Sequence, residues 1–314
     1  MTWPLYLSAM ALPPFLILIL RLFSALLPPR PAQLFSFAAF CLTSLLLTWF
    51  AASCGVVASI ALRCAGYGGL SQWAAGRVFK WTMWAATGVE FRVNESSRVE
   101  GGRRGGEEAL RTRPAVFVGN HQSELDVLML GSIFPQYCSV TAKKSLKWVP
   151  FLGWFMALSK TVFIDRANRT TARAAFDTAA TTMRTSLQSV FIFPEGTRSY
   201  ASTPSLLPFK KGAFHLAIQA QVPIVPIVVA NYAHVCNFQQ RRIAPGVIDV
   251  SVLPPIPTKG LGAQDAEMLM VRAREAMMAE LVRLTHVSGK GEGEPLPRVS
   301  GVEEKRAGEL RKRS

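Results

Sequence analysis

The chain has 314 residues, half of them hydrophobic, and a formal net charge of +15. That length is enough for one domain of common size together with membrane segments. So basic a chain raises the question of nucleic-acid binding, but its cations form no groove motif interleaved with aromatic residues, and the N-terminal region is almost uncharged. We therefore expect no nucleic-acid partner, because anionic lipid headgroups and an acidic substrate fit this charge better.

Two apolar segments occupy the N-terminal region, where we expect a membrane anchor over residues 1–65. Residues 31–62 carry no charged side chain, a stretch longer than the ~20 residues that a spanning helix needs, so we expect a transmembrane helix within 33–62. Upstream, residues 5–27 are apolar apart from Arg21 but contain two adjacent prolines. A second span and a re-entrant segment both remain open for this stretch.

Residues 66–93 combine tryptophan with cations, as in Trp73, Arg77 and Lys80. This mixture suits a helix that lies in the membrane interface with its indole rings at headgroup level. A helix buried against the domain is the alternative, and both descriptions can hold at once. Because Arg63 and these cations follow the apolar segments, the positive-inside rule places the catalytic part on the cytosolic side.

The chain beyond the anchor divides into a linker, a domain and a tail. Residues 94–113 are rich in Gly, Glu and Arg, which is typical of a flexible linker. Over residues 114–286, short apolar runs alternate with helical patterns, which predicts an α/β domain with a mostly central β-sheet flanked by helices. The expected strands are 115–119, 137–142, 161–165, 189–193, 224–231 and 247–253, and the expected helices are 123–133, 146–158, 170–187, 211–219 and 264–284. Residues 287–314 are charged and poor in apolar side chains, so we expect a disordered tail.

The first polar motif contains His121 and Asp126 and directly follows the expected strand 115–119. Residues 123–126 match a capping box, with Ser123 as N-cap and Asp126 at the third helical position. This geometry leaves His121 on the incoming loop and turns the Asp126 carboxylate back toward the imidazole. A carboxylate bonded to one ring nitrogen leaves the other nitrogen as a proton acceptor. Taken alone, the segment slightly favours a simpler interpretation, a helix cap beside an ordinary loop histidine.

The second polar motif, Phe193-Pro194-Glu195-Gly196-Thr197-Arg198, follows the expected strand 189–193. Gly196 permits a tight turn, and an arginine is suited to two-point contact with phosphate oxygens. A glutamate does not face a dianion favourably, so we expect Glu195 to orient Arg198 or to accept a hydroxyl hydrogen bond. Taken alone, a strand, a turn and one arginine more often form a surface salt bridge.

These motifs belong to a larger ordered set between residues 70 and 284. The set comprises N-H-x4-D at Asn120, His121 and Asp126, K-x2-L-x3-P-x2-G at Lys143, Leu146, Pro150 and Gly153, F-I-D-R at Phe163–Arg166, F-P-E-G-T-R-S at Phe193–Ser199, and V-P-I-V-P at Val222–Pro226. In order and spacing, the set resembles the glycerolipid acyltransferase family, specifically the 1-acylglycerol-3-phosphate (lysophosphatidic acid) acyltransferases, and residues 142–156 resemble its fungal members. One position departs from the family pattern, because Lys160 stands where the family usually has glycine.

The resemblance implies an integral membrane enzyme that transfers a fatty acyl group from acyl-CoA to the sn-2 hydroxyl of lysophosphatidic acid, giving phosphatidic acid. Acyl-CoA is then a co-substrate, and no cofactor or metal is expected. The implied catalytic pair is His121 as general base and Asp126 as its orienting partner. The implied phosphate-binding residues are Glu195, Gly196, Thr197, Arg198, Arg166 and Lys143, with Asn120, Phe163, Asp165, Pro194 and Pro223 in supporting positions. The fungal likeness points to the endoplasmic reticulum.

Two rival functions remain open at this point. The same chemistry acting on glycerol 3-phosphate or another lysophospholipid is one, and a non-catalytic lipid-phosphate-binding membrane protein is the other. Other chemistries fit less well. The sequence has no G-x-S-x-G nucleophile motif, and its five cysteines form no C-x2-C pair that would indicate zinc or a disulfide framework.

Overall fold

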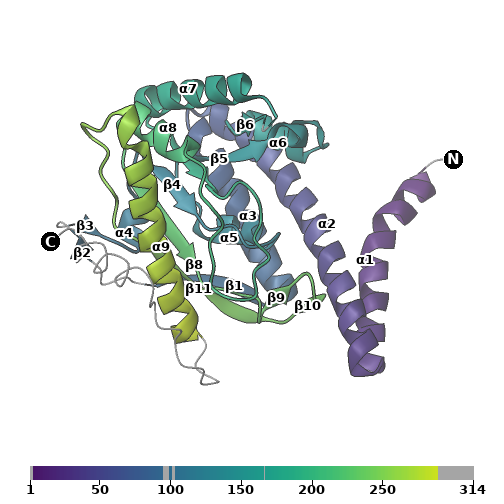
Figure 1. Ribbon diagram of the computed structural model, residues 1–314. Coiled ribbons are helices and arrows are strands. Elements are labelled where there is room, and N and C mark those ends of the chain that lie inside the picture. Colours follow the sequence, from purple (N-terminus) through teal and green to yellow (C-terminus); the bar gives the residue numbers. More distant parts are fainter. Residues whose placement is uncertain (1–2, 95–98, 101–102, 166, 289–314) are drawn as a thin grey trace, which may run out of the picture.

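A seven-stranded sheet forms the centre of the protein (Figure 1), whose computed structural model describes residues 3–94, 99–100, 103–165 and 167–288. The strand order is β1-β11-β8-β4-β7-β5-β6. The strands are β1 (Val89–Asn94), β4 (Val116–Gly119), β5 (Cys138–Lys143), β6 (Val162–Ile164), β7 (Ser189–Ile192), β8 (Ile224–Val229) and β11 (Gly246–Val252). From β8 to β6 all neighbours run parallel, whereas β11 is antiparallel to β8 and parallel to β1. The predicted α/β class with a mostly central sheet is confirmed.

Alternate residues of the central strands face two separate hydrophobic cores. In β4, Val116 and Val118 pack into one core and Phe117 into the other, and in β7 Val190 and Phe191 divide in the same way. This alternation follows from the two-residue repeat of a strand. Because helices cover both faces, these strands are buried throughout and read as continuous apolar runs in the sequence.

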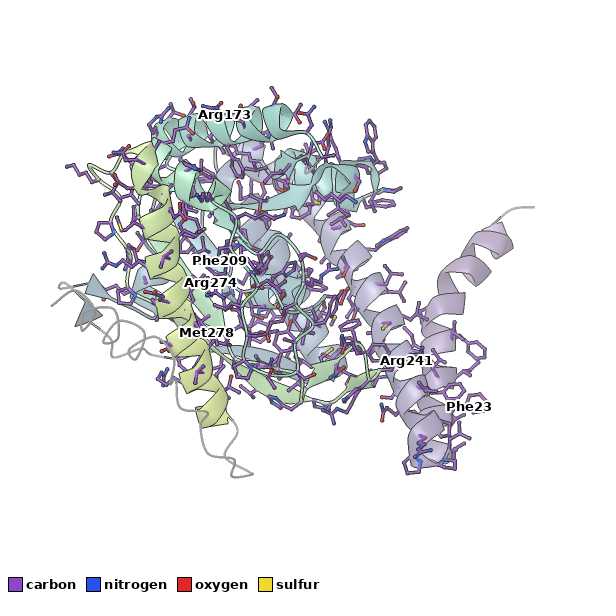
Figure 2. The ribbon with its side chains drawn as sticks, viewed as in Figure 1. Phe23, Arg173, Phe209, Arg241, Arg274 and Met278 are labelled. Atoms are coloured by element: carbon purple, nitrogen blue, oxygen red, sulfur yellow. The ribbon has the colours of Figure 1, made fainter. Side chains whose placement is uncertain are left out.

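Each face of the sheet has its own set of helices. On one face lie α7 (Arg169–Ser186), α8 (Gly212–Ala220) and α9 (Ala266–Ser288), which share a core with the sheet (Figure 1). On the other lie α3 (Ser71–Thr87) and α5 (Asp126–Ile133). Side chains fill the space between sheet and helices, with Phe209 near the middle of the molecule and Arg173 on the outer side of α7 (Figure 2).

Some predicted elements differ from those observed. The expected helix 146–158 is divided into a 3-10 turn, η2 (Lys144–Trp148), and α6 (Leu152–Leu158), because Pro150 between them lacks the N–H that a continuous helix needs. Strand β1 was not predicted, since it lies in the tryptophan-rich stretch that we expected to be helical. Within the expected linker, the structure contains β2 (Val99–Glu100), β3 (Arg103–Arg104) and α4 (Glu107–Leu110). The expected disordered tail lies outside the described residues, apart from the end of α9.

The departure at Lys160 has a local backbone explanation. Lys160 follows α6 with φ of 62°, in the left-handed region that glycine adopts without steric cost. A lysine is therefore strained at a turn to which glycine is better suited. Its exposed side chain lets the chain tolerate the substitution without a packing conflict.

Two helices, α1 (Trp3–Leu26) and α2 (Pro29–Cys64), precede the domain, and α1 turns away from the sheet (Figure 1). Among the described residues, α2 is the one helix long and apolar enough to cross a membrane. It nevertheless contacts the domain along its length. Near its start Gln33 donates to the carbonyl of Gln240 at 2.7 Å, and near its end Arg63 donates to that of Leu158 at 2.7 Å. One face of α2 is therefore fixed to the domain and the opposite face is exposed and apolar.

Candidate active site

The sheet brings the two polar motifs together at one end. β4 and β7 are adjacent and parallel, so the segments that follow their carboxyl ends emerge side by side. The backbone N–H of Ser199 donates to the carbonyl of His121 at 2.9 Å, and that of Tyr200 donates to the carbonyl of Gln122 at 3.0 Å. The histidine loop and the arginine loop therefore form one unit, although they are far apart in sequence.

His121 and Asp126 form a hydrogen-bonded pair. Nδ1 of the imidazole lies 2.7 Å from Oδ2 of the buried Asp126 carboxylate. A carboxylate can only accept, so Nδ1 carries the proton and Nε2 is left as a base. The imidazole also stacks on the ring of Phe193, with centroids 4.1 Å apart and planes inclined by 17°. Carboxylate and ring together fix the orientation of the free nitrogen.

The predicted capping box is half correct. The Asp126 carboxylate does turn back, since Oδ2 accepts the backbone N–H of Gln122 at 2.6 Å and that of Ser123 at 3.2 Å. The helix begins at Asp126, however, and not directly after Ser123, with Leu125 as its N-cap. The Ser123 hydroxyl instead accepts the N–H of Leu125 at 3.2 Å. The carboxylate thus reaches the histidine as expected, from the first position of the helix.

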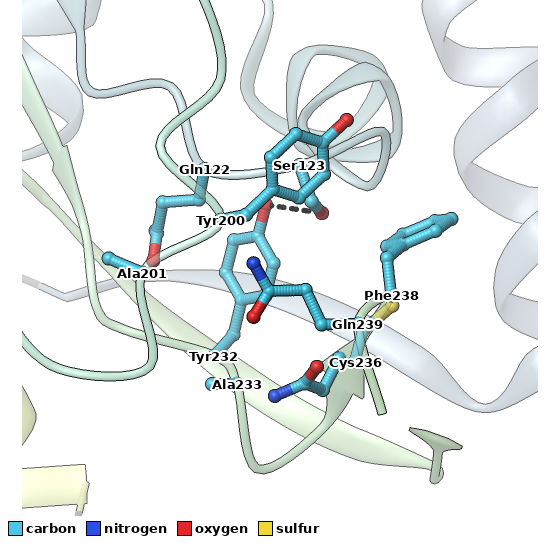
Figure 3. A pocket seen from close by; sticks show the side chains of 10 residues that line it. Gln122, Ser123, Tyr200, Ala201, Tyr232, Ala233, Cys236, Phe238 and Gln239 are labelled. Atoms are coloured by element: carbon cyan, nitrogen blue, oxygen red, sulfur yellow. Dashed lines mark hydrogen bonds between the residues drawn. The ribbon is translucent and has the colours of Figure 1, made fainter. Parts of the chain in front are cut away.

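Tyr232, which sequence reasoning missed, holds the other oxygen of Asp126. Its phenol donates to Oδ1 at 2.7 Å, and the Ser123 hydroxyl lies 2.9 Å from the same phenol (Figure 3). The single phenolic proton goes to the carboxylate, so Ser123 is the donor to Tyr232. Burial is the main cause that raises the pKa of Tyr232 well above its ordinary value, and the neighbouring Asp126 adds to it, so the proton stays in place. Tyr232 follows β8, a neighbour of β4, and that position is the signal that locates it.

Asn120 and Glu195 support the histidine loop through backbone contacts. Asn120 donates to the carbonyl of Val229 at 3.0 Å and accepts its N–H at 2.9 Å, which ties the loop to the end of β8. Glu195 is buried, and its two oxygens accept the N–H of His121 at 2.7 Å and that of Leu207 at 2.9 Å. Because both oxygens are occupied, we assign Glu195 to holding this loop. The expected roles of Glu195, in phosphate binding and in orienting Arg198, stay predictions.

Burial dominates the electrostatics of Glu195. It raises the pKa of the carboxyl above its ordinary value, while the hydrogen bonds from His121 and Leu207 oppose the rise. The carboxyl therefore holds its proton more tightly in the folded protein than in the unfolded chain.

Arg198 pairs with Glu124, a residue that the sequence did not single out. Nη1 of Arg198 lies 3.0 Å from Oε1 of Glu124, and the Tyr200 hydroxyl donates to the same oxygen at 2.7 Å. Lys143, at the end of β5, lines the same large cavity as Arg198. Arg166, the third predicted cation, lies outside the described residues.

The remaining predicted residues shape the surrounding loops. Gly196 has φ of 71°, and a Cβ there would lie 2.7 Å from Nζ of Lys210. Thr197 lines the cavity beside Arg198. The carbonyl of Pro194 accepts the N–H of Lys210 at 2.8 Å, and that of Pro223 accepts the N–H of Val116 at 3.0 Å. Phe163 is part of β6, and Asp165 lies just beyond that strand, where it accepts a hydrogen bond from the N–H of Ala167 at 3.1 Å.

A cavity of about 810 Å³ opens beside His121 and extends beneath α2. Its polar end is formed by residues of the two joined loops, His121, Glu124, Thr197 and Arg198. Lys143 also lines the cavity, and the apolar lining includes Phe40, Leu45, Ala52, Leu128, Leu152 and Phe155. A pocket of this size with one polar end suits a ligand that has an anionic head and an apolar chain. A second, much smaller cavity of about 20 Å³ is lined by Tyr200, Tyr232, Phe238 and neighbouring residues (Figure 3).

Comparisons with known proteins show the family to which the chain belongs. A family model described as Acyltransferase matches residues 103–230. The 1-acyl-sn-glycerol-3-phosphate acyltransferase of Saccharomyces cerevisiae is 41% identical over 76% of this chain and 77% of its own length. The chain belongs to the 1-acyl-sn-glycerol-3-phosphate acyltransferase family. An uncharacterized acyltransferase of Schizosaccharomyces pombe is 45% identical over 73% of this chain and 79% of its own length.

A more distant family member shares the fold. The crystal structure of the 1-acyl-sn-glycerophosphate (LPA) acyltransferase PlsC from Thermotoga maritima superposes with a TM-score of 0.59, covering 81% of this chain and 95% of that one at 20% sequence identity. Within the described part of this chain, no cluster of His, Cys, Asp or Glu side chains is suited to hold a metal ion.

Proposed function

We propose that this protein is a 1-acylglycerol-3-phosphate O-acyltransferase, which transfers a fatty acyl group from acyl-CoA to the sn-2 hydroxyl of lysophosphatidic acid and forms phosphatidic acid. The observation that carries the proposal is the His121–Asp126 pair at the polar end of a long apolar cavity, with Arg198 and Lys143 beside it. Relatives named as 1-acyl-sn-glycerol-3-phosphate acyltransferases support the choice of acceptor.

In this proposal His121 acts as the general base. Its free Nε2 takes the proton from the acceptor hydroxyl, and that oxygen attacks the thioester carbonyl of acyl-CoA. The carbon–sulfur bond then breaks, and the departing thiolate takes the proton back from the imidazolium. Asp126 stabilises the imidazolium between the two steps and keeps Nδ1 protonated. The acyl group passes directly to the acceptor, without an acyl-enzyme intermediate.

The two ends of the cavity suit the two parts of a lysophospholipid. In this proposal Arg198 and Lys143 bind the acceptor phosphate, and the apolar wall formed with α2 binds acyl chains, since all of these residues line one cavity. Holding the phosphate at a fixed distance from His121 selects one hydroxyl by geometry. Glycerol 3-phosphate lacks the chain, and most other lysophospholipids carry a phosphodiester, so each uses only part of this site.

We propose further that the protein is bound to the endoplasmic reticulum membrane with its domain on the cytosolic side. The exposed face of α2, which includes Leu45, Phe50 and Val57, is apolar and contiguous with the cavity wall. Because the other face of α2 contacts the domain along its length, it is the exposed apolar face that is available to lipid. We therefore propose that α2 lies along the membrane surface, so that lipid substrates enter the cavity from the bilayer.

A comparison of acceptors with the purified full-length chain in mixed micelles tests the activity. With acyl-CoA as donor, we expect faster release of CoA with 1-acylglycerol 3-phosphate than with glycerol 3-phosphate or lysophosphatidylcholine. His121→Ala should lower kcat by about 10²–10⁴-fold, the usual contribution of a general base. His215→Ala, which alters an exposed histidine on α8, is the matched control. Full activity in His121→Ala would refute the mechanism, and equal rates without the phosphate would refute the role of Arg198.

A further inference from the structure

Glu124 pairs with Arg198, the side chain that the proposed function assigns to the acceptor phosphate. Its carboxylate lies 3.0 Å from the guanidinium at the polar end of the cavity, and Tyr200 holds the same oxygen. Both charged side chains remain partly exposed, at 38% for Arg198 and 42% for Glu124, so a ligand in the cavity can reach them. An anion is therefore already present at the cation that the proposed function assigns to phosphate.

The pairing of Glu124 with Arg198 is incomplete. Of the described side chains, Oε2 of Glu124 and Nε of Arg198 are among the few buried polar atoms that have no hydrogen-bond partner. The contact between the residues is made through Nη1 alone, although a guanidinium offers a planar fork of donors. Buried polar atoms without hydrogen-bond partners are energetically unfavourable. A ligand that satisfies these atoms better therefore favours separation of the pair.

We propose that Glu124 is a placeholder for phosphate, which occupies Arg198 in the free enzyme and is displaced when a phosphate monoester binds. The terminal oxygens of a phosphate monoester can make the forked contact that the single Glu124 oxygen does not make. The proposal rests on the proposed function, since it takes Arg198 as a ligand of the acceptor phosphate.

Because Glu124 occupies Arg198, the affinity for a phosphate monoester depends on whether that ligand also carries an acyl chain. Separating Glu124 from Arg198 has the same cost for every phosphate monoester, but an acceptor with an acyl chain also gains from burial in the apolar cavity. Inorganic phosphate and glycerol 3-phosphate have no chain to bury. Glu124 thus keeps small phosphates from filling the site and acts as a specificity-determining residue.

Titration calorimetry of the detergent-solubilised full chain with glycerol 3-phosphate, at constant ionic strength, tests the proposal. Glu124→Gln keeps the size of the side chain and removes its charge, so we expect the Kd for glycerol 3-phosphate to fall by about tenfold or more. Glu107→Gln, which alters a carboxylate 3.9 Å from Arg111 on the exposed helix α4, should leave the Kd unchanged. A Kd for Glu124→Gln that is unchanged or larger overturns the proposal, because Glu124 would then support Arg198.

A second variant and a competition experiment complete the test. Tyr200→Phe leaves Glu124 in place but removes one hydrogen bond to it, so it should lower the same Kd by a smaller factor, and no change would count against the proposal. In Glu124→Gln, inhibition of acyl transfer by glycerol 3-phosphate should be competitive with the acceptor. Competition with acyl-CoA would overturn the proposal, since the cation would then bind a CoA phosphate. The calorimetry needs no turnover, so its outcome is separable from that of the His121→Ala experiment.

Discussion

The hydroxyl of Tyr232 lies 2.7 Å from Oδ1 of Asp126, although 106 positions separate the two residues in the chain. Through this bond the loop after β8 supports the carboxylate that orients His121. The catalytic loop, which follows β4, is thereby held from two neighbouring strands, since Tyr232 and the contact of Asn120 with Val229 tie it to the end of β8 and Glu195 binds it from the loop after β7. The position of the His121 imidazole is therefore fixed by contacts with neighbouring strands of the sheet and not by its own loop alone.

Tyr232→Phe should therefore lower kcat although Tyr232 acts through Asp126 and does not itself contact a substrate in the proposed mechanism. The substitution leaves Oδ1 of Asp126 without this donor in a buried site, which costs about 1–3 kcal/mol and corresponds to roughly a tenfold loss for each 1.4 kcal/mol. We expect kcat to fall by about tenfold, with a lower unfolding midpoint, as measured by CoA release and thermal unfolding. Tyr67→Phe, at an exposed tyrosine, is the control. An unchanged kcat would show that the bond does not position His121.

Arg198→Lys should act mainly on binding of the acceptor. A lysine presents a compact charge in place of a fork, so contact with two phosphate oxygens is lost. We expect the KM for 1-acylglycerol 3-phosphate to rise more than the KM for acyl-CoA, as measured by varying each substrate at saturation of the other. Arg173→Lys on the exposed side of α7 provides the comparison. If the KM for acyl-CoA rises instead, Arg198 binds the donor.

Glu195 should make a distinctive contribution to the pH dependence of stability. Burial raises the pKa of the Glu195 carboxyl in the folded protein above the ordinary value of 4.5. The resulting contribution to the free energy of unfolding is therefore fully present when the pH is below 4.5. This contribution is lost as the pH rises through the folded-state pKa. We therefore expect the wild type to gain unfolding temperature relative to Glu195→Gln as the pH falls from about 7 to about 5.

Glu267 offers a control of opposite sign. The hydrogen bond from Lys211 lowers the pKa of this exposed carboxyl, so its contribution is present above the ordinary value and is lost as the pH falls. The wild type should thus lose unfolding temperature relative to Glu267→Gln on acidification. A loss of the same sign for Glu195 would mean that its two N–H partners outweigh burial.

Gly196→Ala tests the turn of the arginine loop. Its φ of 71° disfavours any other residue, and the new Cβ would meet the side chain of Lys210. Gly260→Ala is a matched control, since Gly260 has φ of 85° but no atom within 4 Å of the Cβ position. Both should be destabilised by about 1–2 kcal/mol from backbone strain. We expect only Gly196→Ala also to raise the acceptor KM, and equal kinetic effects would refute a specific role for this turn.

Much of the site follows from local sequence combined with parallel strand order. Apolar runs placed β4 and β7, and in a parallel sheet the residues after such strands meet at one edge, which is why His121 and Arg198 lie together. The capping pattern likewise anticipated the turn of Asp126 toward the histidine.

What was missed depends on long-range pairing. Tyr232 and Glu124 matter because of partners 106 and 74 positions away, and no local pattern distinguishes them from ordinary residues. Strand β1 is a different case, because its sequence alternates apolar and polar residues as a half-buried strand does, and this local signal was overlooked beside the tryptophan-rich helical stretch that precedes it. Glu195 was expected to act on a ligand, since its two backbone partners cannot be inferred from its neighbours.

Helix α2 forms part of the cavity wall, and this limits how far the chain can be truncated to obtain a water-soluble domain. Phe40, Leu45 and Ala52 belong to α2 and also line the cavity. Removing the first 64 residues to obtain a soluble fragment would therefore open one side of that cavity and expose the buried faces of α3 and α6. Helix α2 is a component of the cavity, so forms of the chain that lack it are expected to lose activity.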